Sequence, residues 1–208
     1  MMLKNLVSPG TLVPRVQIRV PRVFWTDLSL IALLIGLDAV ARLVPHAPNF
    51  TPVAASALFA ACLLRARALS VVVPIVGLML GDAVHGFYDW RVMIIVYGAL
   101  ALPACAACVS RRLRAPRMIV PVMLSSSFAF FLLSNLAVWA FSPLYAPNLG
   151  GVVTCYVAAL PFLKYTIAGD LFWAAVLYGG HWLIQSIHAA DMRALKPAVV
   201  GVRRDFGC

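Results

Sequence analysis

Three ionisable residues at helical spacing are the group in this 208-residue sequence that is best placed for chemistry. Asp82, His85 and Asp89 are separated by three and four positions, so a helix would place one imidazole between two carboxylates on a single face. Imidazole and carboxylate groups bind divalent metal ions, but one helix supplies too few ligands for a complete site. We therefore predict a hydrogen-bonded, partly hydrated cluster here and no metal site.

Charged residues also stand close together at two other places within apolar sequence. Asp38 precedes Arg42 by four positions, which allows an ion pair on one helix face or a hydrogen-bonded structural aspartate. Lys164 precedes Asp170 by six positions, and these two could pair with each other or contact a charged solute. Ionisable groups within a membrane span are costly and usually face a bundle interior or a cavity, so all four are candidate site residues.

The segment from Pro45 to Pro52 reads Pro-His-Ala-Pro-Asn-Phe-Thr-Pro and joins two apolar stretches. Proline fixes the backbone angle φ and reduces the freedom that a loop loses when it becomes ordered. Two interpretations remain open. The segment is either a rigid re-entrant connector that lines a cavity with His46, Asn49 and Thr51, or a stiff turn outside the membrane.

Small polar residues occupy the apolar stretch around residue 130. Ser125, Ser126, Ser127, Ser134 and Asn135 are of the kind that lets membrane helices pack closely and form hydrogen bonds with one another. Helix–helix contact is the favoured interpretation and cavity lining is the second. The sequence nowhere combines a nucleophile, a base and an oxyanion-stabilising group, so we predict no catalytic residues. It identifies no cofactor.

The composition predicts which elements position these candidates. Hydrophobic residues make up 63% of the chain and charged residues 12%, with a mean hydropathy of +0.94, whereas soluble domains carry about 25% charged residues. The five cysteines show no disulfide framework, and disordered chains contain far fewer apolar residues. We therefore predict an all-α integral membrane protein.

A helix that crosses the roughly 30 Å hydrocarbon layer needs about 20 apolar residues, and six stretches approach this length. They cover residues 24–44, 52–64, 69–88, 92–109, 118–141 and 165–187, of which the second is short. The last apolar region, residues 150–187, is too long for one crossing and is broken by Pro161, Lys164 and the Gly169-Asp170 pair, so residues 150–163 form a separate segment. We predict that they form a re-entrant or capping helix within a compact bundle of six transmembrane helices that occupies residues 23–188.

The basic residues predict how this bundle is oriented. The chain has 17 lysine and arginine residues and seven acidic residues, which gives a net charge of +10. With both termini in the cytoplasm, 14 of the 17 fall on cytoplasmic segments, and only Arg42, Arg91 and Lys164 lie outside. Residues 1–22 and 189–208 are then cytoplasmic tails. The charge favours membrane lipid as a partner and not nucleic acid, because no module that reads nucleic acid accompanies it.

Most of the polar candidates fall on the outer side of the predicted bundle. This placement indicates a protein that captures a small-molecule solute from outside, and not an enzyme. Two alternatives stay open: a structural or accessory subunit of a larger membrane complex, and a membrane-embedded enzyme that acts on a lipid or quinone through Asp82 and His85. Energy for transport would come from a partner module or a gradient, because no nucleotide-binding motif occurs.

Several strings of the sequence resemble those of a known group of proteins. They are Arg42-Leu-Val-Pro-His-Ala-Pro-Asn-Phe-Thr-Pro-Val-Ala-Ala55, Gly81-Asp82, Val96-Tyr97-Gly98, Ser134-Asn135 with Val138-Trp139, and Cys155-Tyr-Val-Ala-Ala-Leu-Pro-Phe162 leading to Gly169-Asp170. On these strings the chain resembles an uncharacterised family of small bacterial integral membrane proteins (DUF6580-like) that are described as transport proteins. The resemblance leads us to expect a serine before the third-span aspartate, where this chain has Gly81.

The resemblance also has implications for function. The size and six-span outline of that family are similar to the substrate-binding S-components of energy-coupling-factor transporters. This similarity implies uptake of a vitamin-like or cofactor-like solute across the bacterial cytoplasmic (inner) membrane, with other membrane subunits or an energising module as partners. A cysteine ligates cobalt in the cobalamin-uptake members, and Cys155 is the only position here that could correspond. The candidate solute-binding residues are His46, Asn49, Thr51, Asp82, His85, Tyr97, Asn135, Lys164 and Asp170.

Overall fold

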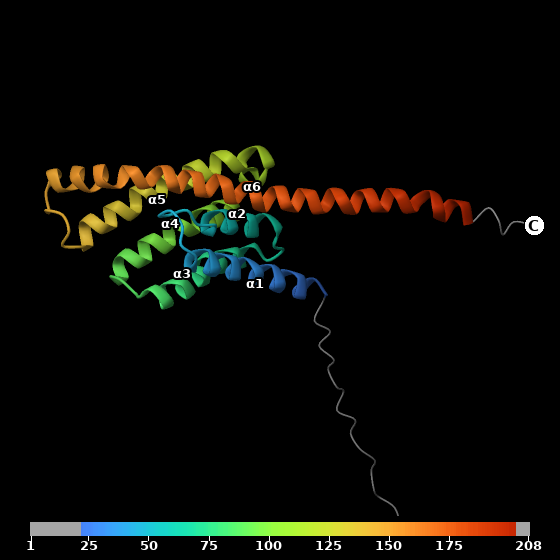
Figure 1. Cartoon of the computed structure of the whole chain (residues 1–208), viewed down its shortest axis with the longest axis horizontal. Coiled ribbons are helices and arrows are strands. Elements are labelled where there is room, and N and C mark those ends of the chain that lie inside the picture. Colours follow the sequence, from blue (N-terminus) through green and yellow to red (C-terminus); the bar gives the residue numbers. More distant parts are fainter. Residues whose placement is uncertain (1–21, 203–208) are drawn as a thin grey trace, which may run out of the picture.

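Six α-helices run alternately up and down a single bundle (Figure 1). The computed structural model describes residues 22–202, with side chains over residues 25–190. The helices are α1 (Arg22–Leu43), α2 (Val53–Leu63), α3 (Val72–His85), α4 (Trp90–Val109), α5 (Ile119–Phe141) and α6 (Leu149–Val202), and short 3₁₀ turns cover Arg67–Val71, Arg111–Arg114 and Pro116–Met118. No strand occurs in this described part of the chain, and the predicted all-α class is confirmed.

Four helical segments are long and apolar enough to cross a membrane. They are Arg67–His85, Trp90–Val109, Pro116–Phe141 and Leu149–Ala190. Large apolar side chains point away from the bundle along these segments, and Ile94, Leu132 and Val153 are each more than half exposed. Broad apolar surface of this kind is typical of helices that are surrounded by lipid. The protein is therefore a multi-pass membrane protein.

The first two helices differ from these four, although the sequence predicts six spans. α1 carries three ionisable residues among its described side chains, Asp27, Asp38 and Arg42. α2 has 11 residues, which correspond to about 16 Å at 1.5 Å per residue and thus to roughly half the hydrocarbon thickness. The apolar stretch predicted over residues 52–64 is therefore a helix that is too short to cross a membrane by itself.

α2 lies at the centre of the bundle. Every residue from Val53 to Ala61 is buried, and α1, α3, α4 and α6 all pack against this helix. Its many alanines occupy little volume, so that the neighbouring helices approach closely. Leu58 packs in one core cluster with Met123 of α5, and the ring of Phe59 meets that of Tyr178 on α6 edge-on at 5.1 Å.

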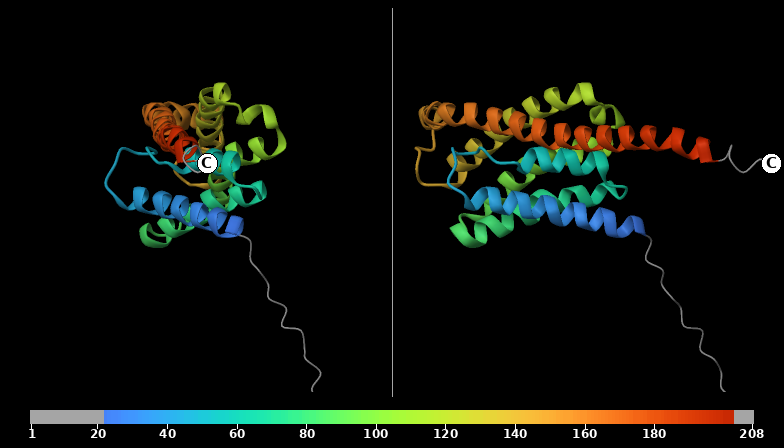
Figure 2. Two further views of the ribbon diagram at one scale, coloured as in Figure 1. Left: turned by 90° about the vertical axis from the view of Figure 1, so that its right-hand side faces the viewer. Right: turned by 45° about the vertical axis from the view of Figure 1, so that its right-hand side comes forward.

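α6 is one continuous helix, which corrects the predicted interruption between residues 150–163 and the last span. Pro161 removes one backbone N–H donor without ending the helix, and its side chain is exposed, as is that of Lys164. The 54 residues of α6 extend over about 81 Å, more than twice the hydrocarbon thickness. The helix packs against α5 and α2 and then continues beyond the rest of the bundle (Figure 1, Figure 2).

The two ends of the bundle carry different connections. One end, which we call the loop end, carries residues 44–52, 86–89 and 142–148, and the opposite end, the arginine end, carries residues 64–71 and 110–118 (Figure 1). The arginine end holds Arg65, Arg67, Arg111, Arg112, Arg114 and Arg117. The fold thus gathers on one end the loops that the sequence assigns to one side of the membrane. Which end faces the cytoplasm stays a prediction, because the basic tails over residues 1–21 and 203–208 lie outside the described residues.

Candidate functional site

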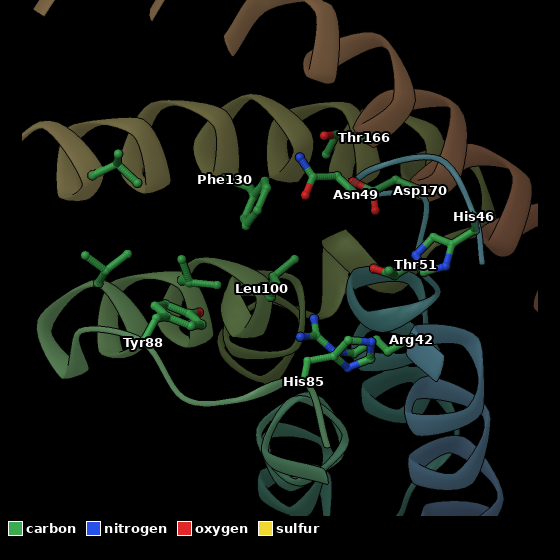
Figure 3. Close-up of a pocket in the computed structure, with 13 residues that line it drawn as sticks. Arg42, His46, Asn49, Thr51, His85, Tyr88, Leu100, Phe130, Thr166 and Asp170 are labelled. Atoms are coloured by element: carbon green, nitrogen blue, oxygen red, sulfur yellow. The ribbon is translucent and has the colours of Figure 1, made fainter. Parts of the chain in front are cut away.

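A cavity of about 430 Å³ lies at the loop end, and we call it the main cavity (Figure 3). Its lining consists of Arg42, His46, Asn49, Thr51, His85, Tyr88, Val92, Val96, Leu100, Phe130, Val138, Thr166 and Asp170. His46 and His85 are exposed, whereas Thr166 and Asp170 are buried, so the lining leads from the surface into the bundle. Five of the nine predicted solute-binding residues line this cavity: His46, Asn49, Thr51, His85 and Asp170.

Two further predicted residues support the cavity wall through Arg42. The Arg42 guanidinium forms an ion pair with Asp82 on α3, and the hydroxyl group of Tyr97 on α4 donates a hydrogen bond of 2.7 Å to the other carboxylate oxygen of Asp82. Asp82 is buried, with 2% of its surface exposed. Asp82 and Tyr97 therefore fix the position of Arg42, although neither of them lines the main cavity itself.

Arg42 pairs with Asp82 and not with Asp38, so of the two possibilities for Asp38 the structure supports the hydrogen-bonded structural aspartate. Asp38 is fully buried and accepts a hydrogen bond of 2.7 Å from the Ser56 hydroxyl group on α2. The Arg42 side chain passes over Gly81, where a Cβ atom would overlap it. Gly81 thus provides the space through which Arg42 reaches Asp82, which gives a physical reason for glycine where the resemblance leads us to expect serine.

The predicted cluster of Asp82, His85 and Asp89 does not form one polar face. α3 ends at His85, and Gly86 follows with φ of +100°, so Asp89 no longer shares the helix. The Asp89 carboxylate instead accepts a hydrogen bond of 2.8 Å from the backbone N–H of Arg91 and caps α4. Over the described residues, no group of three side chains is placed to hold a metal ion.

The loop between α1 and α2 contributes three residues to the main cavity and packs against α6. Asn49 adopts a left-handed conformation with φ of +62°, which asparagine tolerates better than most residues. A Cβ atom on Gly169 of α6 would lie 2.9 Å from the Cα atom of Phe50, so glycine permits a close approach between helix and loop. The rings of Phe50 and Phe172 pack at 5.4 Å. The loop therefore lines the cavity as an ordered connector.

Asp170 lies in the deep wall of the main cavity, opposite Arg42 and His85 (Figure 3). Its side chain accepts a hydrogen bond of 2.5 Å from the Ser127 hydroxyl group on α5, and 4% of its surface is exposed. Asp170 does not pair with Lys164, which is one of the two possibilities that the sequence leaves open for these residues. Six positions place the two residues on different faces of α6, and the Lys164 ammonium group instead lies 4.9 Å from the ring centre of Tyr165, outside the cavity lining.

Asn135 lines a neighbouring cavity of about 160 Å³, and its amide group donates a hydrogen bond of 2.7 Å to the Phe131 carbonyl oxygen. This smaller cavity shares Asn49, Phe130 and Thr166 with the main cavity. Eight of the nine predicted residues therefore lie in or directly beside the two cavities, and Lys164 does not.

Three polar lining residues are absent from the nine predicted solute-binding residues: Arg42, which the sequence marks only as a candidate ion-pair residue, Tyr88 and Thr166. Thr166 precedes Asp170 by four positions, a spacing that places both on one helix face and could have identified it. Tyr88 lies in the connection between α3 and α4, where its position suggests only an interfacial anchor. Partial burial, together with the negative charge of Asp82, raises the pKa of Tyr88 to about 12, and the charge of Arg42 opposes this rise.

The remaining lining is apolar and comes from α4 and α5, with Val92, Val96, Leu100, Phe130 and Val138. No pattern in the sequence distinguishes these residues from the apolar majority. The cavity combines one cationic side chain, two imidazoles, one carboxylate and several neutral polar groups with this apolar surface. Such a lining can bind a small molecule that has polar groups at its ends and an apolar body.

Comparison with known proteins places the chain in a family. The chain matches a family of unknown function (DUF6580) over residues 23–193, a range that includes every residue of the main cavity. No curated protein and no solved structure matches the chain. Because the match covers most of the chain, this protein belongs to the DUF6580 family.

Proposed function

We propose that this protein takes up a small organic solute, and that the main cavity binds it. The observation that carries this proposal is the convergence of polar side chains from five helices or loops on one cavity within an apolar bundle. Polar and ionisable residues in a membrane interior are costly and usually serve a function. The cavity volume of about 430 Å³ lies within the range of about 300–1,000 Å³ that is usual for ligand sites.

The two walls of the cavity limit the chemistry of the solute. Arg42 offers hydrogen-bond donors on one wall, and Asp170 offers an acceptor on the other (Figure 3). Leu100 and Phe130 supply apolar surface between them. We infer a vitamin-like or cofactor-like molecule with an acceptor-rich group at one end and a donor at the other.

The proposed topology has six crossings, with both termini in the cytoplasm of a bacterial cell. In it, α2 and the ordered loop before it complete one crossing together, since α2 alone is too short. The main cavity then opens on the outer side, where a solute arrives. The six-helix outline supports a role like that of the S-components, with an energising module as partner. That similarity concerns architecture only.

The proposal is tested by solute binding to the purified protein. Small molecules retained by the protein are released and identified by mass spectrometry, and their affinity is then measured by calorimetry. We expect Asp170→Asn and Asn49→Gly to weaken binding at least about tenfold, which corresponds to 1.4 kcal/mol. Glycine at position 49 keeps the left-handed backbone. Lys164→Gln, outside the cavity, serves as the control and should bind normally. Unchanged affinity in both cavity variants would contradict the proposal.

The projecting part of α6 favours a second candidate function, a subunit of a larger membrane complex. α6 continues beyond the other helices (Figure 1). Directly after the contact of His181 with Phe59, the side chains of Trp182, Leu183 and Ile184 are each more than half exposed. Another chain could cover this surface. In this case the protein should co-purify in mild detergent with neighbours at a fixed ratio, and isolation only as a monomer would contradict the idea.

A further inference from the structure

A second hollow lies between α4 and α5, and nothing in the proposed function uses it. It has a volume of about 310 Å³, and we call it the α4–α5 groove. Its lining is almost wholly apolar and consists of Leu102, Pro103, Ala106, Leu113, Met118, Pro121, Val122, Ser125, Ser126 and Ala129. The hydroxyl group of Ser126 is buried and has no hydrogen-bond partner in the described part of the chain. The groove therefore offers an occupant mainly van der Waals contact.

The groove is directly connected to the arginine end. Leu113 lies in the 3₁₀ turn Arg111–Arg114, and Met118 ends the next turn, Pro116–Met118. Arginines flank both of these lining residues along the chain: Arg112 and Arg114 stand on either side of Leu113, and Arg117 precedes Met118. Three arginines thus directly adjoin, along the chain, two residues that line the groove.

The arginines at this end form no ion pair with a carboxylate of residues 25–190. Among residues 25–190 the one ion pair is that between Arg42 and Asp82, at the opposite end of the bundle. Asp27 interacts with the arginine end through its carboxylate, but it accepts its hydrogen bond from the backbone N–H of Arg65. The Nη1 atom of Arg114 is buried and has no hydrogen-bond partner among the described residues. No carboxylate of the described side chains therefore neutralises the arginine end, and its positive charge attracts an anion.

We propose that the α4–α5 groove with its arginines is a binding site for one anionic phospholipid. An acyl chain would occupy the groove between α4 and α5, and the headgroup phosphate would contact Arg112, Arg114 and Arg117. Arginine binds phosphate oxygens in a bidentate manner, and basic pockets beside transmembrane helices are typical sites for anionic headgroups. The charge of these arginines would select an anionic lipid over a zwitterionic one, and the apolar lining of the groove would select a lipid over free phosphate.

Native mass spectrometry of the full-length protein tests this site with defined lipids. The protein is titrated with palmitoyl-oleoyl phosphatidylglycerol and with the phosphatidylcholine of the same chains. We expect one phosphatidylglycerol to bind at least tenfold more tightly than phosphatidylcholine. In the double variant Arg112→Gln/Arg117→Gln this preference should be lost. Arg91→Gln, at the loop end, is the matched control and should keep it.

Two further measurements distinguish lipid binding in the groove from nonspecific electrostatic attraction of an anionic lipid. Ala129→Phe fills the groove from α5, and Ala106→Leu narrows it from α4, so each should weaken the binding of both lipids if it remains folded by circular dichroism. Inorganic phosphate at millimolar concentration should not displace the lipid. Equal affinity for the two lipids, displacement by phosphate, or full binding by whichever groove variant folds would overturn the proposal.

Discussion

The main cavity and the α4–α5 groove are both hollows between helices, but they are built in opposite ways. Side chains from distant parts of the chain meet around the main cavity, and several of them, such as Arg42 and Asp170, are held there by partners on other helices. The groove is lined by two consecutive helices and the turns between them, and its one buried polar group, Ser126, has no hydrogen-bond partner in the described part of the chain.

The difference shows that a membrane bundle can separate two kinds of recognition. Burial of the polar residues around the main cavity requires specific hydrogen bonds, because an unsatisfied polar group costs about 1–3 kcal/mol. The groove needs no such partners and can accept any chain-like apolar molecule. We therefore expect stability to depend strongly on side chains at the loop end and weakly on those at the groove. Four experiments test this contrast.

The largest effect is expected for Asp82→Ala. This substitution leaves the Arg42 charge without its partner and removes the acceptor of the Tyr97 hydroxyl group. Loss of one member of a buried ion pair costs about 3 kcal/mol of folding stability, which denaturant unfolding in detergent would measure. Replacement of both charged residues, Arg42→Met with Asp82→Leu, should recover most of the loss. If the double variant is no more stable than the single one, the ion pair does not hold these helices together.

A smaller loss is expected from closing the contact between α6 and the loop. Gly169→Ala places a Cβ atom 2.9 Å from the Cα atom of Phe50, so that helix and loop must move apart. Overpacking of this kind costs about 1–3 kcal/mol and should widen the main cavity. Gly179→Ala on the same helix meets nothing within 4 Å and serves as the control. Equal melting temperatures for the two variants would show that the loop is not held by α6.

Two adjacent serines give the sharpest comparison between the regions. Ser127 donates a hydrogen bond to Asp170 at the main cavity, whereas Ser126 lines the groove without a partner among the described residues. Ser127→Ala should cost about 1–2 kcal/mol, and Ser126→Ala should be neutral or stabilise the lipid-free protein by up to about 1 kcal/mol. Ser127→Ala should thus lower the unfolding free energy, whereas Ser126→Ala should not. A larger loss for Ser126→Ala would remove the proposed contrast.

The smallest effect concerns pH at the mouth of the main cavity. The pKa of Tyr88 is raised to about 12 in the folded protein, above the value of about 10 in an unfolded chain. A raised folded-state pKa means that its contribution to stability is present below pH 10 and is lost as the pH rises toward 12. The difference in absorbance at 295 nm between the protein and Tyr88→Phe should therefore titrate near pH 12. A midpoint near 10 would contradict the partial burial of this ring.

The helices could largely be predicted from the sequence, because apolar runs of membrane length follow from local composition. The stretches predicted over 92–109 and 118–141 agree closely with α4 and α5. The continuity of α6 could not be predicted, since a proline within a helix either ends it or is accommodated by its surroundings. Here the surroundings accommodate Pro161 on an exposed face.

The candidate site could be predicted only in part. Polar residues within apolar runs predicted a site at the loop end, because a buried polar group is costly and its presence usually has a reason. The partners of these residues could not be identified. Arg42 has a possible partner on its own helix, Asp38, but forms its ion pair with Asp82 on α3. The hydrogen bonds from Ser56 to Asp38 and from Ser127 to Asp170 could not be predicted either. Such pairs depend on the packing between helices and not on spacing along one of them.

The central position of α2 has a consequence for how the protein is made. A helix of 11 residues that is buried on all sides cannot remain in lipid by itself, and α6, one of the helices that cover it, is synthesised last. The hydroxyl group of Tyr178, for example, bonds to Cys62, 116 positions earlier in the chain. We expect α2 and the preceding loop to pack stably only after α6 has been synthesised. The main cavity should therefore form last, when α6 packs against them.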